Sequence, residues 1–141
     1  MHFHQGIIVK QVLIDTDIIS FFLRNHNSVV KKFKSYLSEY EKINFGIITY
    51  YEILSGLKYK DAQKQLDAFL QFSEYNSILP VSENSIEISA DIYSDLRRKG
   101  VLVDDIDILI AGIAISNNLI LVTHNTNHFN RIDHLEIEDW L

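Results

Sequence analysis

Short, fully apolar segments alternate with helical segments along most of this chain, and this alternation is the feature that most restricts its fold. Residues 12–14, 43–48, 78–81 and 119–123 have the character of buried strands, and a last short strand is expected near 135–137. Between them, apolar residues recur three and four positions apart, which is typical of helices. Buried strands joined by helices predict a parallel sheet covered on both faces. The predicted fold class is therefore α/β, and ligands of such sheets bind beyond the carboxyl ends of the strands.

The helices expected between these strands have recognisable ends. They cover residues 18–23, 29–40, 49–57, 61–75, 83–99 and 106–116. Ser28 is a candidate cap of the second helix, and Gly100 suits the end of the fifth. The last helix is apolar nearly all round and contains Ala111, Gly112 and Ala114. These small residues would let this helix approach the sheet closely.

The length and composition indicate one ordinary globular domain. A chain of 141 residues favours a single domain, 1–141, of which residues 1–11 are expected to form a mobile N-terminal extension. Without cysteine, the chain has no disulfide and no thiolate metal site, and no apolar run is long enough to cross a membrane. We therefore expect a cytoplasmic protein. The net charge of −6 argues against a nucleic-acid partner, unless bound cations cancel a cluster of acids.

Four polar residues stand at the predicted carboxyl ends of the strands or just beyond them. Asp15 follows the first strand, Glu52 and Asp107 lie in the first turns of two helices, and Asn125 follows the fourth strand. Taken singly, Asp15 is explained as a turn residue or helix cap, and Asp107 by the positive end of its helix. Glu52 fits a capping box with Thr49.

Taken together, these acids point to a metal ion. Three carboxylates gathered at one edge of a sheet repel one another strongly where the effective dielectric constant is low. A hard cation such as Mg²⁺ or Mn²⁺ relieves that repulsion, because it prefers carboxylate oxygens as ligands. The pattern therefore favours a metal site over three unrelated helix caps.

Four short motifs occur in a fixed order along the chain. They are IDTDIIS at 14–20, ITYYEI at 48–53, DIDILIA at 105–111 and LVTHN at 121–125, the last followed by Phe129. This order and spacing resemble those of the PIN-domain ribonucleases, and within them most of all the VapC-type toxins of toxin–antitoxin pairs. The resemblance extends over residues 12–141.

The resemblance implies a three-layer α/β/α sandwich around a central, mainly parallel sheet. It implies a Mg²⁺- or Mn²⁺-dependent endoribonuclease that hydrolyses RNA, with tRNA as one candidate substrate, to products with 5′-phosphate and 3′-hydroxyl ends. It further implies a homodimer and inhibition by a cognate VapB-type antitoxin. The metal-binding and catalytic acids of the family map onto Asp15, Glu52 and Asp107. The family's fourth, variable acidic position maps onto Asn125, an amide. Asn125 and Asp17 are candidate further metal ligands, and Asp17 would compensate for the missing charge.

Side chains near these acids are predicted to support them. Hydroxyl groups can hold carboxylates or water around a metal, and the candidates are Thr16, Ser20, Thr49 and Thr123. Asp104 or Asp105 caps the helix that carries Asp107, and we assign Asp105 to the same supporting group.

Other polar residues are assigned outside the metal site. Arg97, Arg98 and Lys99 end a helix just before the acidic loop, where we predict contacts with RNA phosphates, a solvated surface being the alternative. The six histidines receive no catalytic role. His124 and His128 are four residues apart, but on a predicted loop over 124–133, where that spacing does not place them on one helical face.

The implied antitoxin requires a groove beside the acids. The pairs Tyr50–Tyr51 and Phe21–Phe22 are predicted to line it, although about half of these rings belong in the core because helical faces alternate.

Three other functions fit the sequence less well. A DNA-acting 5′-nuclease shares the fold but needs helical insertions for which 141 residues leave little room. A catalytically weak or inactive RNA-binding module is suggested by Asn125 and by the negative net charge. A phosphate-receiver domain also clusters acids at strand ends, but it needs a Lys after its last long strand, and none occurs in residues 119–130.

Overall fold

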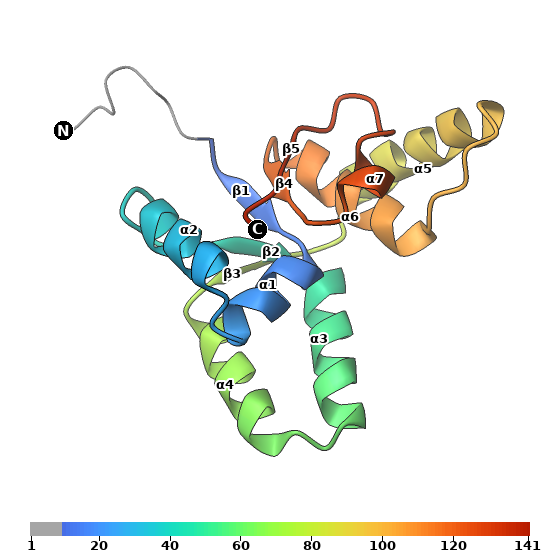
Figure 1. Ribbon diagram of the computed structural model, residues 1–141. Helices are drawn as coiled ribbons and strands as arrows, with labels where there is room; N and C mark the ends of the chain where they lie inside the picture. The colour runs from blue at the N-terminus through green and yellow to red at the C-terminus, as the bar shows by residue number, and fades with distance from the viewer. Residues whose placement is uncertain (1–9) are drawn as a thin grey trace.

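Five short strands form a central sheet in the computed structural model, which describes residues 10–141 (Figure 1). They are β1 Val12–Ile14, β2 Asn44–Gly46, β3 Ser77–Leu79, β4 Ile120–Val122 and β5 Ile137–Glu138. Their order is β3-β2-β1-β4-β5, and all the pairings are parallel. The chain starts at the central strand β1, adds β2 and β3 on one side of it, and then adds β4 and β5 on the other side. The switch point therefore lies between β1 and β4, which is where open parallel sheets bind ligands.

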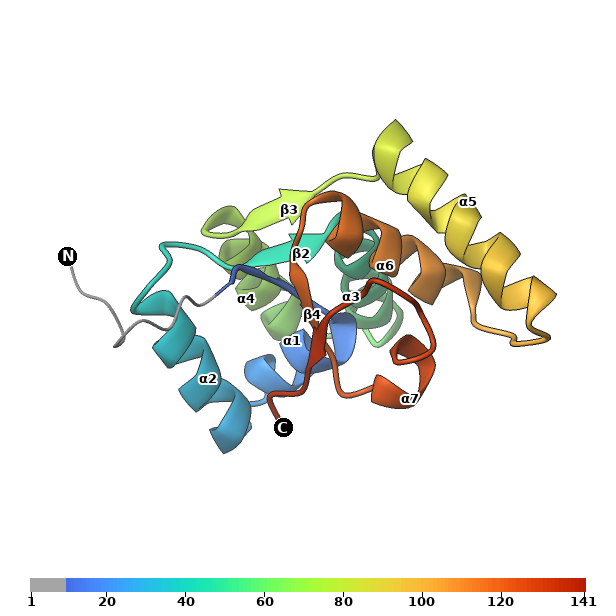
Figure 2. The ribbon, with the colours of Figure 1, turned by 90° about the horizontal axis from the view of Figure 1, so that it is seen from above.

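Seven helices among the described residues cover the two faces of this sheet. They are α1 Thr16–Leu23, α2 Asn27–Leu37, α3 Ile47–Tyr59, α4 Gln63–Glu74, α5 Glu83–Arg98, α6 Asp105–Ser116 and α7 Thr126–Phe129. Side chains alternate across a strand, so Val12 and Ile14 share a core with α1 to α4, whereas Leu13 shares one with α5 to α7. Seen from above, α2 and α5 lie on opposite sides of the sheet (Figure 2). The predicted three-layer α/β/α sandwich is confirmed.

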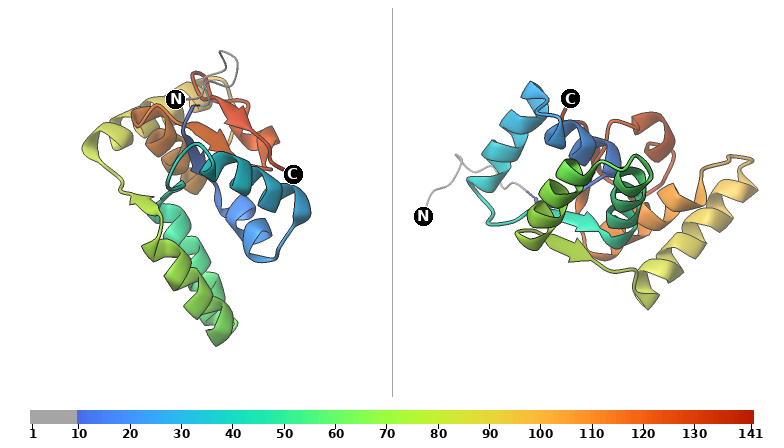
Figure 3. Two further views of the ribbon diagram at one scale, coloured as in Figure 1. Left: turned by 90° about the vertical axis from the view of Figure 1, so that its left-hand side faces the viewer. Right: turned by 90° about the horizontal axis from the view of Figure 1, so that it is seen from below.

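Three helices begin at the carboxyl edge of the sheet. Helix α1 follows β1 and helix α3 follows β2, so both start where those strands end. Helix α6 precedes β4 and runs back along it, so α6 also begins at this edge. Helices α3 and α4 then extend away from the sheet as a hairpin (Figure 3, left). Residues in the early turns of α1, α3 and α6 therefore face a common region.

Four helices, α1 to α4, begin two residues away from their predicted starts, and for two of them the predicted cap is also wrong. Helix α3 begins at Ile47 rather than Thr49, with Gly46 as its N-cap, because the apolar residues after β2 continue the strand pattern into the helix. Helix α2 begins at Asn27 and is capped by the backbone of His26, not by Ser28. The Ser28 hydroxyl instead donates to the backbone carbonyl of Trp140, at 2.8 Å.

The predicted N-terminal extension is only partly described. Residues 1–9, including His2 and His4, lie outside the described residues. Within the described part, Lys10 pairs with Glu136, and the Gln11 carbonyl accepts a hydrogen bond from the Ile120 N–H, so residues 10 and 11 belong to the folded body. None of the helices in residues 10–141 combines the length and apolarity needed to cross a membrane.

Of the three small residues of α6, Gly112 meets α5 rather than the sheet, which differs from the prediction, whereas Ala111 and Ala114 share a core cluster with residues of β1 and β4. A Cβ atom on Gly112 would overlap the Ser89 Oγ and lie 2.6 Å from the Ser85 carbonyl oxygen. The Ser89 hydroxyl also donates to the Ile108 carbonyl across this contact, at 3.0 Å. Gly112 therefore permits the close approach of the two helices.

Substitution of Gly112 tests this packing. We expect Gly112→Ala to lower the free energy of unfolding by about 1–3 kcal/mol, because overpacking forces the two helices apart. The matched control is Gly56→Ala on α3, where an added Cβ meets nothing within 4 Å. That change should stabilise the protein by up to about 1 kcal/mol through helix propensity. Urea unfolding of both variants measures the difference, and equal effects would contradict the packing argument.

Candidate functional site

Asp15 lies at the switch point of the sheet. It is the N-cap of α1, directly after β1, and its side chain is buried, with 6% of its surface exposed. The Thr16 backbone N–H donates to its Oδ1 at 2.8 Å, and the Thr123 hydroxyl, just beyond β4, donates to its Oδ2 at 2.8 Å. The carboxylate therefore joins the ends of the two central strands.

The electrostatic environment of Asp15 is unfavourable for a negative charge. Burial, together with the nearby charges of Asp17 and Asp107, raises the pKa of Asp15 to about 7, although the Thr123 and Thr16 donors act to lower it. No Lys or Arg forms an ion pair with Asp15 in the described part of the chain. A positive charge placed beside this carboxylate would therefore be stabilised.

Asp17, in the first turn of α1, is a second acid at the same edge. The backbone N–H of Ile18 donates to its Oδ1 at 2.7 Å, and that of His124 donates to its Oδ2 at 3.1 Å. Burial is the main cause of a raised pKa for Asp17, which these two donors partly offset. Asp17 thus adds negative charge to the environment of Asp15, as its raised pKa reflects.

Glu52 is attached to the site through Thr16. The Thr16 hydroxyl lies 2.6 Å from Glu52 Oε1, to which it donates, and 3.0 Å from the Thr49 Oγ1. Because α3 begins at Ile47, Glu52 occupies its second turn rather than its first, and Thr49 is inside the helix. The capping-box explanation of these two residues is therefore wrong, and Glu52 is held from α1.

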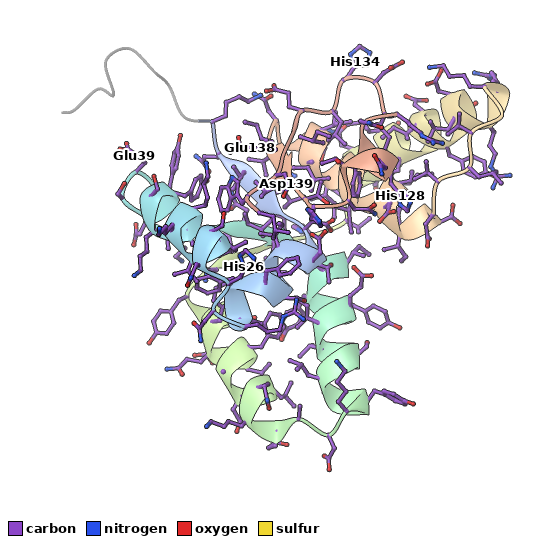
Figure 4. All side chains as sticks on the ribbon, viewed as in Figure 1. His26, Glu39, His128, His134, Glu138 and Asp139 are labelled. Atoms are coloured by element: carbon purple, nitrogen blue, oxygen red, sulfur yellow. The ribbon has the colours of Figure 1, made fainter. Side chains whose placement is uncertain are left out.

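Asp107, in the first turn of α6, contacts a residue that sequence reasoning set aside. Its Oδ2 lies 3.2 Å from the Nδ1 of His128, and the same Nδ1 lies 2.9 Å from the Nδ2 of Asn125. His128 lies on α7, on the side of the molecule where α6 begins (Figure 4). The segment 124–133 was predicted as a loop without a helix. The short helix α7 brings His128 and Asn125 together three residues apart.

The structure thus brings the predicted site residues near one another, but not into one tight cluster. Asp17 and Asp107 both act electrostatically on Asp15, Glu52 hydrogen-bonds to Thr16 beside it, and Asn125 contacts Asp107 through His128. Among residues 10–141, however, no three His, Asp or Glu side chains converge closely enough to hold a metal ion by themselves. The expected tight convergence of Asp15, Glu52 and Asp107 is therefore not present: Thr123 holds Asp15, Thr16 holds Glu52, and His128 contacts Asp107.

The supporting residues behave differently from one another. Thr16 donates to Glu52 and Thr123 donates to Asp15, whereas the Thr49 hydroxyl contacts that of Thr16; their support of a metal site stays a prediction. Ser20 lines a neighbouring groove instead. Asp104, not Asp105, caps α6, because the Asp104 carboxylate accepts from the Ile106 N–H at 3.1 Å. Asp105 is exposed at the first position of that helix.

The donors nevertheless suit a divalent cation chemically. The acids at this edge offer only oxygen atoms, which Mg²⁺ and Mn²⁺ prefer. The most buried of them, Asp15, has no cationic partner within residues 10–141 and has a raised pKa. A bound cation would neutralise these charges and favour the ionised form of Asp15.

The basic residues at the end of α5 lie away from this edge. Lys99 forms ion pairs with Asp95 and Asp133, and the Arg97 guanidinium lies over the Tyr93 ring, 4.5 Å from its centre. Figures 1 and 2 place this end of α5 at the periphery of the molecule. Contacts of Arg97, Arg98 and Lys99 with RNA remain a prediction.

A groove with a volume of about 400 Å³ opens beside Glu52, between α1, α3 and α4. Leu23, Ile53 and Leu57 give it apolar walls, and Arg24 and Lys60 add positive charge. The four aromatic residues predicted to line such a groove do not line this one. Phe22 stacks on the buried Phe33, Tyr50 packs near Phe45 and Phe69, Phe21 contacts His26, and Tyr51 points into solvent with 66% of its surface exposed.

Comparison with known proteins agrees with the motifs. Residues 12–135 match the PIN domain family model. Ribonuclease VapC1 of Methanocaldococcus jannaschii is 30% identical over 123 residues, which cover 87% of this chain and 82% of that protein. The tRNA(fMet)-specific endonuclease VapC of Shigella flexneri is 29% identical, over 91% of this chain and 96% of its own. A chain in the structure of DNA-bound VapBC from Salmonella typhimurium superposes with a TM-score of 0.84 at 27% identity, covering 94% of this chain and 100% of that one.

Proposed function

The chain belongs to the PIN-domain family, as its motifs predicted, and on this premise we propose that it is the endoribonuclease toxin of a VapBC-type toxin–antitoxin pair. The names of its relatives, ribonuclease VapC1 and tRNA(fMet)-specific endonuclease VapC, support hydrolysis of RNA, with tRNA as a candidate substrate. A protein acting on such a substrate works in the cytoplasm. Homodimerisation, which the family resemblance implies, is part of the same proposal.

One observation of the site carries the proposal. Asp15 is a buried carboxylate at the switch point of the sheet, its pKa is raised by burial and by two neighbouring acids, and no basic side chain among the described residues pairs with it. A structural helix cap gains nothing from two further acids beside it. A site that receives a divalent cation does, because the cation compensates the charge.

We assign the cation to oxygens of Asp15 and Asp107, with Glu52 and Asp17 as further ligands. When bound, Mg²⁺ or Mn²⁺ would polarise the phosphate and lower the pKa of a water molecule. The chain itself fixes the acids before substrate arrives: Thr123 holds Asp15, and Thr16 holds one oxygen of Glu52, leaving the other for the cation or for orienting water. Hydrolysis would leave 5′-phosphate and 3′-hydroxyl ends.

A cleavage assay separates this function from its alternatives. The purified protein is incubated with structured RNA, including tRNA, and with flap DNA, in Mg²⁺, in Mn²⁺ and in EDTA. We expect cleavage of RNA only, and only with a divalent cation. Preferred cleavage of flap DNA would support a 5′-nuclease. Binding of RNA without any cleavage would support an inactive RNA-binding module.

We further propose that a VapB-type antitoxin binds in the groove beside Glu52. The solved relative is a VapBC complex, which supports such a partner. The apolar walls suit an amphipathic helix, and Arg24 and Lys60 suit acidic side chains on it. A partner seated there would cover Glu52 and exclude RNA from the acids.

Filling the groove should weaken this complex. Gly56 is exposed and lines the groove, and a Cβ atom added there meets nothing within 4 Å, so we expect Gly56→Trp to fold, as circular dichroism would check, and to occupy the partner's space. We expect its affinity for the antitoxin encoded beside the toxin to fall at least about tenfold, since about 1.4 kcal/mol of lost binding energy suffices. Calorimetry with the purified partner measures the change.

Two controls complete this experiment. Gly56→Ala adds one methyl group and should bind the partner as the wild type does. In cells, co-expression of the partner should relieve growth arrest by the wild type and by Gly56→Ala, but less so by Gly56→Trp. Wild-type affinity of Gly56→Trp would place the partner elsewhere on the surface.

A further inference from the structure

A single imidazole nitrogen stands between two polar partners at the start of α6. The Nδ1 of His128 lies 3.2 Å from the Asp107 Oδ2 and 2.9 Å from the Asn125 Nδ2. The Asp107 side chain is mostly buried, with 18% exposed, whereas 56% of the His128 side chain is exposed. The Asp107 carboxylate is therefore held from its solvent side by a ring that belongs to another helix.

One nitrogen cannot serve both partners in the same way. An ionised carboxylate only accepts, so a bond to Asp107 requires a proton on Nδ1. The Asn125 NH₂ group only donates, so a bond from it requires a bare Nδ1. Hydrogen bonds to a charged group are roughly twice as strong as those between neutral groups, so Asp107 determines the tautomer. Nδ1–H then donates to Asp107, the Asn125 amide turns so that its Oδ1 rather than its NH₂ faces the ring, and Nε2 is the bare nitrogen when the ring is neutral.

The position of this ring is fixed by the fold. His128 is on α7, and the next residue, Phe129, is fully buried in the core cluster shared with α6. The start of α7 is tied to β4, because the Asn125 backbone N–H donates to the Thr123 hydroxyl at 3.0 Å. That same hydroxyl donates to Asp15. One short segment thus contacts both acids assigned to the cation.

We propose that His128 is a positioning residue for Asp107: its Nδ1–H fixes the orientation of the carboxylate through Oδ2 and leaves Oδ1 for the cation. This inference rests on the proposed metal-dependent function and adds a residue from this chain to it. Groups that hydrogen-bond to metal ligands commonly change metal affinity by about 10–100-fold when removed. His128 acts on Asp107 and needs no contact with RNA to do so.

Mn²⁺ binding, measured by electron paramagnetic resonance without RNA, tests the proposal. We expect His128→Ala to bind Mn²⁺ about 10–100-fold more weakly than the wild type. In His128→Asn the side-chain amide nitrogen can take the place of Nδ1, so this variant should recover most of the lost affinity. The control is His134→Asn, which removes an exposed imidazole at the top of the molecule in Figure 4, away from the start of α6, and keeps a residue that tolerates the positive φ of 67° there.

The possible outcomes are distinct. Equal or tighter Mn²⁺ binding by His128→Ala, or no recovery in a folded His128→Asn, would overturn the positioning role while leaving the proposed function intact. A wild type that binds no Mn²⁺ would overturn the metal-dependent function, and the role of His128 with it. Nitrogen-15 NMR of the cation-free protein gives an independent test, because a His128 ring protonated at Nε2 instead of Nδ1 when neutral would also contradict the proposal.

Discussion

RNA cleavage by the Asp107→Asn variant is expected to fall by about 10²–10³-fold or more, while the protein stays folded. The amide keeps the shape of the side chain but removes a charge that the cation needs. Charge stabilisation by a bound metal contributes several kcal/mol to the transition state, and each 1.36 kcal/mol lost is about tenfold in rate. Asp107 lies in the first turn of α6 and caps nothing, because Asp104 is the N-cap. Its loss should therefore change the melting temperature little.

The assay for this variant needs a control that changes an acid elsewhere. Asp91 is exposed on α5, and Asp91→Asn makes the same substitution there. Initial rates on one RNA substrate in saturating Mg²⁺, together with circular dichroism of each variant, measure the effect. Cleavage by Asp107→Asn within a few-fold of the Asp91→Asn rate would remove Asp107 from the mechanism.

The architecture could be predicted because the pattern that encodes it is local. Val12–Ile14 is apolar at every position, which only a strand covered on both faces explains. Exact helix starts could not be predicted where apolar residues continue past a strand. Ile47 and Ile48 extend the pattern of β2, but the chain has already turned into α3 at that point. Whether such a residue continues the strand or begins a helix depends on tertiary packing, and a short stretch of sequence does not reveal that packing.

The acids of the site could be predicted, but not what holds them. Asp15 and Asp107 are recognisable because polar residues among Ile and Leu are costly without a purpose. The bond from Thr16 to Glu52 and the contact of His128 with Asp107 join residues on different helices. Such contacts depend on how helices cross. Asn125 and His128 are three residues apart, a spacing that predicts contact only if the segment is helical, and residues 124–133 were predicted to be a loop.

The residues that line the groove could not be predicted from the sequence either. Aromatic residues beside Glu52 were reasonable candidates for its lining, but helical faces alternate, and Phe22 and Tyr50 turned toward the core. The lining comes from residues that carry no motif, such as Gly56 and Leu57. A groove is a property of the space between elements, so its position follows only from the packed structure.

The Asp15→Asn variant is expected to be more stable than the wild type in the absence of cations. Asp15 has a pKa of about 7 in the folded protein, against an ordinary value of 3.8. A group whose pKa is raised by folding contributes most to stability at low pH, below its unfolded value, and that contribution is lost as pH rises through its folded value. The wild type in EDTA should therefore lose stability between about pH 4 and pH 7. A pKa difference of this size corresponds to about 4 kcal/mol.

Asparagine cannot ionise, so it avoids this loss but gives up part of the hydrogen bonding from Thr123 and Thr16. Allowing about 1–2 kcal/mol for those bonds, we expect Asp15→Asn to melt roughly 5–10 °C above the wild type in EDTA at pH 8. At pH 5 the difference should shrink, because Asp15 is then largely protonated. Millimolar Mg²⁺ should stabilise the wild type more than the variant, since stabilisation by a ligand follows its affinity.

A purely structural role for Asp15 predicts almost no change. Asparagine caps helices about as well as aspartate, so Asp15→Asn keeps the cap, and its effect on stability should then depend neither on pH nor on whether a metal is present. Melting curves of both proteins at pH 5 and pH 8, each in EDTA and in Mg²⁺, therefore distinguish a cap from a cation site. If Asp15→Asn melts no higher than the wild type in EDTA at both pH values, and Mg²⁺ raises both melting temperatures equally, Asp15 is a helix cap and the cation must bind elsewhere.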